Sequence, residues 1–214
     1  MQRYRREEHE PPDRQAHTEN SQGVYTRTAA IYDWAVRWVP LWRKWLGHAL
    51  PHLQGPRVLE VSFGTGWLMT QYASRYDAYG IDYNPRMAQI AARNLRRCGT
   101  PARLQIADVY RLPYASGVFN SVVNTMAFSG YAHGRPALAE VARVLVPGGR
   151  VVMVDVGYPL SGSRLGALLA RYWEVSGDIL RDMGPLFREF GFDLTEQEIG
   201  GFGSIHLYVA QKTA

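Results

Sequence analysis

Cysteine is almost missing from the sequence, and long apolar runs are missing altogether. Cys98 is the single cysteine among 214 residues, which excludes an internal disulfide framework and a multi-cysteine metal site and is typical of a reducing compartment. No stretch approaches the roughly 20 apolar residues of a membrane-spanning helix, and the first residues lack the apolar core of a secretory signal. We expect a cytoplasmic protein, which could still contact a membrane surface.

Blocks of like charge are also absent. The net charge is +5 and the pI is about 9.4, but basic residues are interspersed with acids, so nucleic acid is not an expected partner. Residues 1–22 show no apolar periodicity and are expected to form a disordered tail. The remaining residues 23–214 are expected to form one domain, because 46% of the chain is hydrophobic and can supply a core.

The order of segments predicts a doubly wound α/β domain. Helical patterns near residues 66–75, 85–97 and 136–146 alternate with the short apolar runs "RVLEVS", "DAYGID", "ARLQIAD", "FNSVVNTM" and "GRVVMVDV". Strands that are apolar on both faces are typical of a parallel sheet covered by helices on both sides. This pattern places a cofactor-binding core at residues 56–157.

Other segments flank this core. Residues 23–55 have helical periodicity and are expected to form a lid of two short helices that meet near Pro40, which can begin a helix but not continue one. Residues 158–178 are expected to cover the substrate. Residues 179–214 are expected to form a last helix near 179–190 and then an antiparallel hairpin of "FDLTEQEIGG" and "SIHLYVAQK".

Polar side chains follow one strand after another. Glu60 closes the first strand, Asp82 the second and Asp108 the third, while Asn124 and Thr125 close the fourth. In an open parallel sheet, ligands bind at the carboxyl ends of the strands. These side chains therefore predict a cofactor site at that edge.

The stretch "RVLEVSFGTGWLM" (57–69) joins the first strand to a glycine-rich turn. Gly64 and Gly66, which lack Cβ, permit a tight turn and let a ligand lie against the main chain and the N-terminus of the following helix. Asp82 follows Gly66 by 16 residues, the position of an acid that accepts hydrogen bonds from two ribose hydroxyls. A nucleoside is the expected ligand.

Two common nucleotide signatures are missing. Met69 stands where the dinucleotide motif G-x-G-x-x-G needs its third glycine, and the chain has no P-loop motif. A ligand with ribose and adenine but no pyrophosphate fits best, and S-adenosylmethionine is such a ligand. A nucleotide-dependent oxidoreductase is the less favoured alternative.

The chain resembles the class I S-adenosylmethionine-dependent methyltransferases, in the branch of the ubiquinone and menaquinone biosynthesis enzymes. The resemblance rests on "VLEVSFGTGWL", "AYGIDYNPRMAQIAARN", "ADVYRLPYASGVFNSVV" and "EVARVLVPGGRVVMVDV", which follow one another at the family's spacing. It implies a Rossmann-like sheet of seven strands whose last strand is antiparallel. It also implies in-line methyl transfer that yields S-adenosylhomocysteine, with no metal.

The resemblance also implies a role for each residue at the strand ends. Beneath the cofactor and at its methionine end it places Glu60, Ser62, Phe63, Gly64, Gly66, Asn124, Thr125 and Met126. Around the ribose and adenine it places Asp82, Tyr83, Met87, Asp108 and Val109. Ser62 replaces the family's usual first glycine, and a serine avoids strain there only with a negative φ.

His133, Tyr25 and Tyr32 are the catalytic candidates, and a general base is needed only if the acceptor must lose a proton. His133, in "FSGYAHGRP" after the fourth strand, could accept a proton near neutral pH; a solvated loop histidine is the alternative. In similar proteins the helical segment before the first strand closes over the cofactor, so Tyr25 or Tyr32 could meet the methionine carboxylate or the acceptor. Core packing is the alternative for Tyr32.

Trp34, Trp38, Trp42 and Trp45 recur at helical spacing with basic residues among them. An aromatic face beside basic residues is typical of an interfacial helix and predicts peripheral contact with a membrane surface through this segment. The alternative is that these side chains pack onto the sheet, which is favoured because Pro40 interrupts the stripe.

The acceptor is expected to be a small, largely apolar or lipid-like molecule that is methylated on oxygen, nitrogen or carbon. Family members build the acceptor pocket from the N-terminal helices and from the region that is "YPLSGSRLGALLARYWEVSG" here, and both segments are rich in aromatic and aliphatic residues. A non-catalytic S-adenosylmethionine-binding module is one alternative. An RNA methyltransferase is disfavoured because no basic helix with interleaved aromatics is present.

Overall fold

The computed structural model describes residues 40–213 of the chain. Several predictions fall outside these residues, namely the tail over 1–22, the tyrosines Tyr25 and Tyr32, and the tryptophans Trp34 and Trp38. Within 40–213, no helix has both the length and the apolar character needed to cross a membrane.

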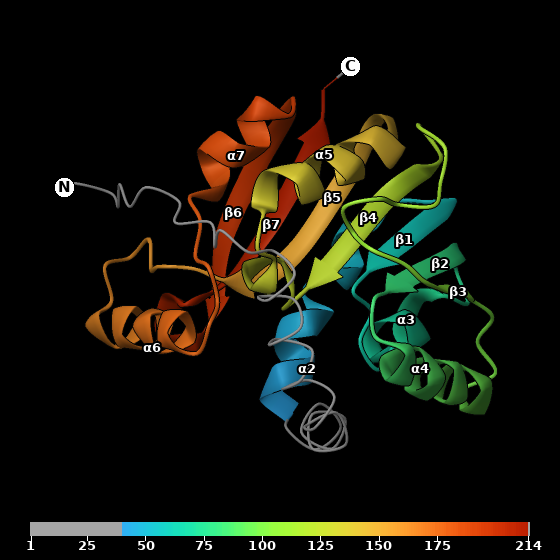
Figure 1. Ribbon diagram of the computed structural model, residues 1–214. Helices are drawn as coiled ribbons and strands as arrows, with labels where there is room; N and C mark the ends of the chain where they lie inside the picture. The colour runs from blue at the N-terminus through green and yellow to red at the C-terminus, as the bar shows by residue number, and fades with distance from the viewer. Residues whose placement is uncertain (1–39, 214) are drawn as a thin grey trace.

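Seven strands form one sheet in the order β3-β2-β1-β4-β5-β7-β6 (Figure 1). They are β1 (Arg57–Val61), β2 (Asp77–Asp82), β3 (Arg103–Ile106), β4 (Phe119–Thr125), β5 (Leu145–Val156), β6 (Phe192–Gly200) and β7 (Ile205–Lys212). β7 pairs antiparallel with β5 and β6, whereas β1 to β5 pair in parallel. The predicted doubly wound sheet with a reversed last strand is confirmed. Its strand order reverses between β1 and β4, where ligands bind in such sheets.

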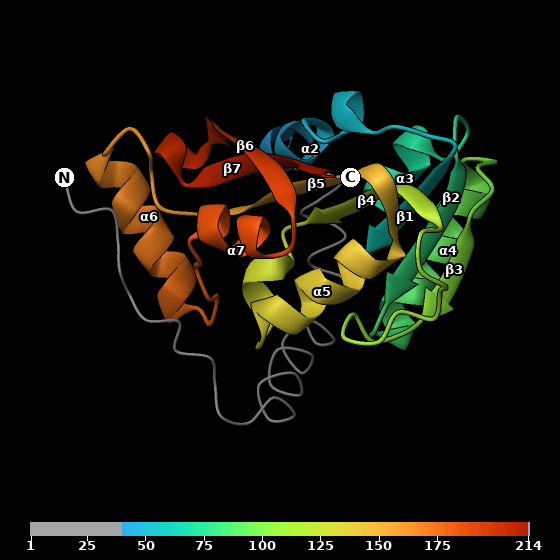
Figure 2. The ribbon, with the colours of Figure 1, turned by 90° about the horizontal axis from the view of Figure 1, so that it is seen from above.

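Helices cover both faces of the sheet. They are α2 (Pro40–Gly47), α3 (Trp67–Tyr72), α4 (Pro85–Arg97), α5 (Gly134–Val144), α6 (Arg164–Val175) and α7 (Met183–Glu189), with short turns η1 (Leu50–His52), η2 (Phe128–Gly130) and η3 (Gly201–Gly203). Seen from above, α2 and α3 lie on one side of the sheet and α5 and α7 on the other (Figure 2). Val58 and Leu59, adjacent in β1, are buried in opposite cores. This double burial explains why the strands are continuous apolar runs.

The helix boundaries follow local capping where it exists. α4 begins where predicted, because Pro85 occupies its first turn and Asn84 Oδ1 accepts a hydrogen bond from the Arg86 amide at 2.9 Å. The last helix was predicted over 179–190, but α7 begins only at Met183. Asp182 caps it through the Gly184 amide at 3.2 Å. The preceding residues instead bond to the η2 region, which a sequence pattern does not encode.

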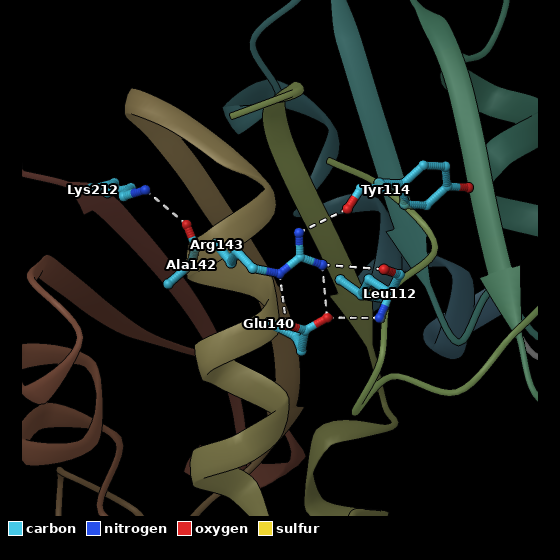
Figure 3. A network of polar contacts seen from close by, with 6 residues as sticks. All are labelled: Leu112, Tyr114, Glu140, Ala142, Arg143 and Lys212. Carbon is cyan, nitrogen blue, oxygen red and sulfur yellow. Dashed lines mark hydrogen bonds and ion pairs between the residues drawn. The ribbon is translucent and has the colours of Figure 1, made fainter. Parts of the chain in front are cut away.

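Glu140 and Arg143 on α5 hold the loop between β3 and β4 (Figure 3). Arg143 donates hydrogen bonds to the carbonyl oxygens of Tyr114 (2.7 Å) and Leu112 (3.1 Å), and Glu140 accepts one from the Leu112 amide at 2.7 Å. The two side chains also form an ion pair, with Arg143 Nε 2.7 Å from Glu140 Oε1. Because the same loop carries Asp108, this pair supports the edge of the predicted cofactor site.

Arg143→Ala is expected to lower the free energy of unfolding by about 2–3 kcal/mol, because it removes a charged donor from two carbonyl groups and leaves Glu140 partly buried without its cation. Urea denaturation measures the change. Arg135→Ala is the matched control: Arg135 pairs with Glu189 at side-chain exposures of 50% and 47%, and loss of an exposed pair costs at most about 1 kcal/mol. Equal losses in the two variants would contradict the role given to Arg143.

Candidate active site

A pocket lies at the carboxyl ends of β1 and β4, where the strand order reverses. Among the residues predicted for a cofactor, the ones that line it are Glu60, Ser62, Phe63, Gly64 and Thr125. Leu46, Thr65, Trp67 and Leu68 complete the lining. Residues from α2, β1, α3 and β4 thus meet at one point of the sheet edge, as expected for a doubly wound fold.

Glu60 is a buried acid in the wall of this pocket, with 2% of its surface exposed. Burial raises the pKa of Glu60 to about 8, although the Tyr72 hydroxyl, which donates to Glu60 Oε2 at 3.0 Å, acts to lower it. The nearby negative charge of Asp82 adds to the rise. Among residues 40–213, no basic side chain forms an ion pair with Glu60. A cation in the pocket would offset the cost of this buried charge.

Asp82 connects the end of β2 to the glycine-rich turn. Its Oδ2 accepts a hydrogen bond from the Gly64 amide and its Oδ1 one from the Asn84 amide, both at 2.8 Å. Burial raises the pKa of Asp82 to about 6, and the two backbone hydrogen bonds oppose that rise. Each oxygen keeps a lone pair for a further donor, so the carboxylate can accept hydrogen bonds from two adjacent hydroxyls.

Gly66 is required by packing within the protein. Its φ is 71°, and a Cβ there would lie 2.8 Å from the Cβ of Ala91 on α4. The missing side chain therefore lets α3 begin directly against α4. The sequence predicts Gly66 to permit a tight turn and the close approach of a ligand. Its positive φ agrees with the turn, and contact with α4 is a further reason for glycine at this position.

Two residues other than glycine have a positive φ at the switch point. Ser62, after β1, has φ 57°, and Met126, after β4, has φ 53°. Non-glycine residues in this region are strained by about 1–3 kcal/mol and cluster at ligand sites. The serine at the family's glycine position therefore does not keep the negative φ that would avoid strain. Its amide is held by the Ile81 carbonyl oxygen at 2.8 Å.

A hydrogen-bonded group of three side chains spans the same ends. The Tyr131 hydroxyl lies 2.7 Å from Ser62 Oγ and accepts a hydrogen bond from Asn124 Nδ2 at 2.9 Å. Asn124 Nδ2 also donates to the Val61 carbonyl oxygen at 3.0 Å. Asn124 Oδ1 is buried and has no hydrogen-bond partner in the described part of the chain. An unpaired buried acceptor of this kind fits a ligand that carries a donor.

None of the residues predicted for the adenine lines this pocket. Three of them lie on the loops after β2 and β3, namely Tyr83, Asp108 and Val109, and Met87 lies in the first turn of α4. Tyr83 is 52% exposed, whereas Met87 and Val109 are buried. Asp108 Oδ1 accepts a hydrogen bond from the Tyr110 amide at 3.0 Å, which closes a tight turn after β3. The structure thus separates the predicted residues into a polar pocket at β1 and β4 and a rim at β2 and β3.

His133 lies beside an aromatic group next to this network. It occupies the N-cap position of α5 without a capping hydrogen bond from its side chain, and its amide donates to the Tyr110 hydroxyl at 3.1 Å. The ring of Tyr110 lies 6.4 Å from that of His133 and 6.3 Å from that of Tyr131. His133 is therefore one aromatic side chain away from the strand ends, rather than on the pocket wall.

Trp42 and Trp45 pack into the protein. Their rings lie 5.9 Å apart and contact the core formed with α3 and α4. A Cβ on Gly200 would lie 2.0 Å from Trp45 Nε1, so the indole presses against the end of β6. For these two tryptophans, the packing alternative from the sequence describes the structure.

Sequence reasoning missed Tyr131, Tyr72 and Trp67. Tyr131 lies two residues before His133 in the polar segment after β4, so that segment was the available signal. Tyr72 and Trp67 belong to α3, and in the sequence they have the spacing of ordinary apolar residues of a helix. Their contacts with the site depend on how α3 lies against β1, which no local pattern encodes.

Comparisons with known proteins agree with this arrangement. A family model described as a methyltransferase domain matches residues 58–149. A demethylmenaquinone methyltransferase of Deinococcus radiodurans is 32% identical over 178 residues, covering 78% of this chain and 73% of the relative. The O-methyltransferase cnsE of Penicillium expansum is 32% identical over 161 residues, covering 71% of this chain and 57% of the relative.

A solved structure shares the fold at lower identity. The cyclase SpnF matches with a TM-score of 0.67 and 17% identity, covering 79% of this chain and 80% of that chain. Since SpnF is a cyclase by name, the fold by itself does not specify the reaction. The sequence relatives do: the chain is an S-adenosylmethionine-dependent enzyme and belongs to the class I methyltransferases, in the branch of the ubiquinone and menaquinone biosynthesis enzymes.

Proposed function

We propose that this methyltransferase methylates a small, apolar, quinone-related acceptor. The observation that carries the cofactor part of the proposal is Glu60, an acid buried in the pocket wall with no cationic partner in residues 40–213. The acceptor part is supported by the apolar residues in the same lining. S-adenosylmethionine brings a methyl group already activated by a sulfonium cation, together with an ammonium group. The named demethylmenaquinone relative supports a quinone-related acceptor, and the O-methyltransferase relative supports oxygen methylation as the second candidate.

The residues present fit the methionine and ribose parts of the cofactor. Glu60 would accept a hydrogen bond from the amino group, since it is a buried acceptor in the pocket wall. Asn124 is in register with Val61 and so lies on the opposite face of the sheet from Glu60, where its unpaired Oδ1 would accept from a different donor of the ligand. Asp82 would accept from the two ribose hydroxyls through the lone pairs that its backbone donors leave. The turn formed by Ser62, Phe63, Gly64 and Gly66 would lie beneath the cofactor.

The rim would hold the adenine. Tyr83 is exposed directly after β2, and Met87 is buried in the first turn of α4, so an aromatic and a thioether side chain flank the turn between β2 and α4. Asp108 and Val109 supply a polar and an apolar group at the end of β3. This division suits a base that is apolar on its faces and polar at its edge.

An apolar acceptor matches the rest of the lining. Leu46, Phe63, Trp67 and Leu68 are the apolar side chains that line the pocket. Methyl transfer needs the acceptor atom held in line with the methyl group, and such positioning can lower the barrier by about 7–11 kcal/mol in the best cases. Rigid apolar walls supply that positioning and exclude water.

A base is needed if the acceptor is a phenol or a quinol. We assign this role to His133, which lies in the segment after β4 and next to the Tyr110–Tyr131 pair. Tyr25 and Tyr32 lie outside the described residues and stay candidates. A carbon acceptor in a quinol ring must lose a proton after methylation, so one base serves carbon and oxygen chemistry alike.

Asp82→Asn is expected to weaken S-adenosylhomocysteine binding more than tenfold at pH 7, because a charge-assisted acceptor is worth about 1.5–3 kcal/mol. The ribose hydroxyls favour the ionised acid, whose pKa is about 6 without ligand. Wild-type affinity should therefore fall about tenfold between pH 7 and pH 5 through this group alone. Calorimetry at both pH values measures the two effects.

Asp193→Asn is the control for these measurements, because Asp193 is exposed on β6, far along the sheet from the switch point. It should leave the affinity and its pH dependence at wild-type values. An Asp82→Asn variant that keeps the wild-type fall between pH 7 and pH 5 would remove Asp82 from the ribose site.

Ser62→Gly and Tyr131→Phe test the strained turn. Ser62→Gly relieves the strain of a positive φ but loses the hydrogen bond to the Tyr131 hydroxyl, so its unfolding free energy should stay within about 1 kcal/mol of wild type.

Tyr131→Phe removes the hydroxyl that accepts a hydrogen bond from Asn124. The loss should weaken cofactor binding about three- to tenfold. A double-mutant cycle of melting experiments should give a coupling of about 0.5–1.5 kcal/mol. A coupling of zero would show that the Ser62–Tyr131 bond stabilises nothing.

The decisive experiment is an S-adenosylhomocysteine release assay with reduced demethylated quinones, simple phenols and small amines. We expect turnover with the quinols and at least tenfold less with the amines. His133→Ala should slow turnover about 100-fold or more while cofactor affinity stays constant. Cofactor binding without turnover on any acceptor would favour a non-catalytic binding module, and binding of NAD in preference would favour an oxidoreductase.

A further inference from the structure

Helix α6 turns four large apolar side chains toward solvent. Leu165, Leu168, Tyr172 and Val175 are 59%, 65%, 63% and 82% exposed. They are spaced by three, four and three residues, which places them on one side of the helix. Exposed apolar residues are usually scattered singly, and a contiguous set marks an interaction surface.

Close packing fixes which side of α6 faces outward. A Cβ on Gly166 would lie 2.2 Å from the Phe202 carbonyl oxygen and 2.6 Å from Pro159 Cγ, so α6 meets η3 backbone directly. Ala170, one turn later on the same side, is fully buried. The side with Gly166 and Ala170 therefore faces the protein, where Trp173 also packs against the core, and the four exposed apolar side chains are held away from it.

Two arginines lie within the outward side. Arg164 and Arg171 are exposed and stand four residues before and three residues after Leu168, so they share its side of the helix. Glu174 is the acid of α6; it is half-buried and accepts a hydrogen bond from the Tyr158 hydroxyl. This side of α6 therefore combines apolar side chains with arginines and has no outward acid. Such a combination complements a surface with an apolar interior beneath a layer of negatively charged groups.

The position of α6 relates this surface to the pocket. Figure 1 shows α6 and α2 at the same edge of the sheet, the edge where the arrow of β4 ends. Leu46 of α2 lines the pocket at that edge. Phe202, whose backbone α6 touches, is 66% exposed with a φ of 54°, so a strained turn presents another aromatic ring beside α6.

We propose that the outward side of α6, defined by Leu165, Leu168, Tyr172, Val175, Arg164 and Arg171 and called the α6 face, docks on an anionic lipid bilayer. The apolar side chains enter the headgroup boundary and the arginines contact lipid phosphates. The inference rests on the proposed apolar acceptor for its purpose, because a docked enzyme would meet such an acceptor where it dissolves. Trp42 and Trp45 are not part of this face, since both are partly buried against the core on α2.

Sedimentation with vesicles tests the α6 face on the full chain. Wild type should bind vesicles with about 30% phosphatidylglycerol in phosphatidylcholine more tightly than pure phosphatidylcholine, and less tightly as salt rises. Leu168→Glu with Tyr172→Glu should reduce binding at least about tenfold. Arg164→Gln and Arg171→Gln should each reduce it about fivefold, which corresponds to about 1 kcal/mol per charge near an anionic surface.

Ile106→Glu is the matched control, because Ile106 is also 59% exposed but lies on β3 at the opposite end of the sheet. It should bind vesicles like wild type. Calorimetry with S-adenosylhomocysteine separates the two proposals: normal cofactor affinity without vesicle binding overturns only the α6 face.

Two further outcomes would overturn it. Unchanged vesicle binding in the Leu168→Glu, Tyr172→Glu variant would place the contact elsewhere in the chain, residues 1–39 included. A dimer in analytical ultracentrifugation that this variant converts to monomer would assign the α6 face to a second copy of the chain.

Discussion

The hydrogen bond from the Gly64 amide to Asp82, 2.8 Å long, holds the candidate site together. It ties the turn after β1 to the end of β2, while the Asn84 amide fixes the other carboxylate oxygen. With both oxygens held by backbone groups, the acid has a defined orientation before any ligand arrives. Preorganisation of this kind lowers the cost of ordering the site when a ligand binds.

The two buried acids of the site lower the stability of the fold. Glu60 and Asp82 both have a pKa above its ordinary value because burial disfavours their charged forms. Between those ordinary values and the raised ones, the folded chain binds more protons than the unfolded chain, so its stability falls as pH rises through this window. A cationic ligand reverses part of this cost. The site is therefore stabilised most by the kind of molecule that the family uses.

The strain at Ser62 and Met126 belongs to the same compromise between stability and function. Both lie directly after a strand at the switch point, where the chain must turn sharply to leave room for a ligand. Glycine would adopt these conformations without strain. At Ser62, the hydrogen bond to Tyr131 compensates for the missing glycine and connects the turn to Asn124. The serine that replaces the family's glycine thus forms a hydrogen bond with Tyr131, a residue 69 positions later in the chain.

What the sequence determined by itself was local. Apolar runs and their helical or strand period identified β1 to β7, and Pro85 with Asn84 marked the start of α4. The acids that follow the strands predicted a cofactor at that edge of the sheet. Tertiary structure decided the rest: the positive φ of Ser62, the bond to Tyr131, the contact of Gly66 with α4 and the outward side of α6. The physical reason is that period and capping depend on neighbours within a few residues, whereas burial, pKa and hydrogen-bond partners depend on residues that only folding brings together.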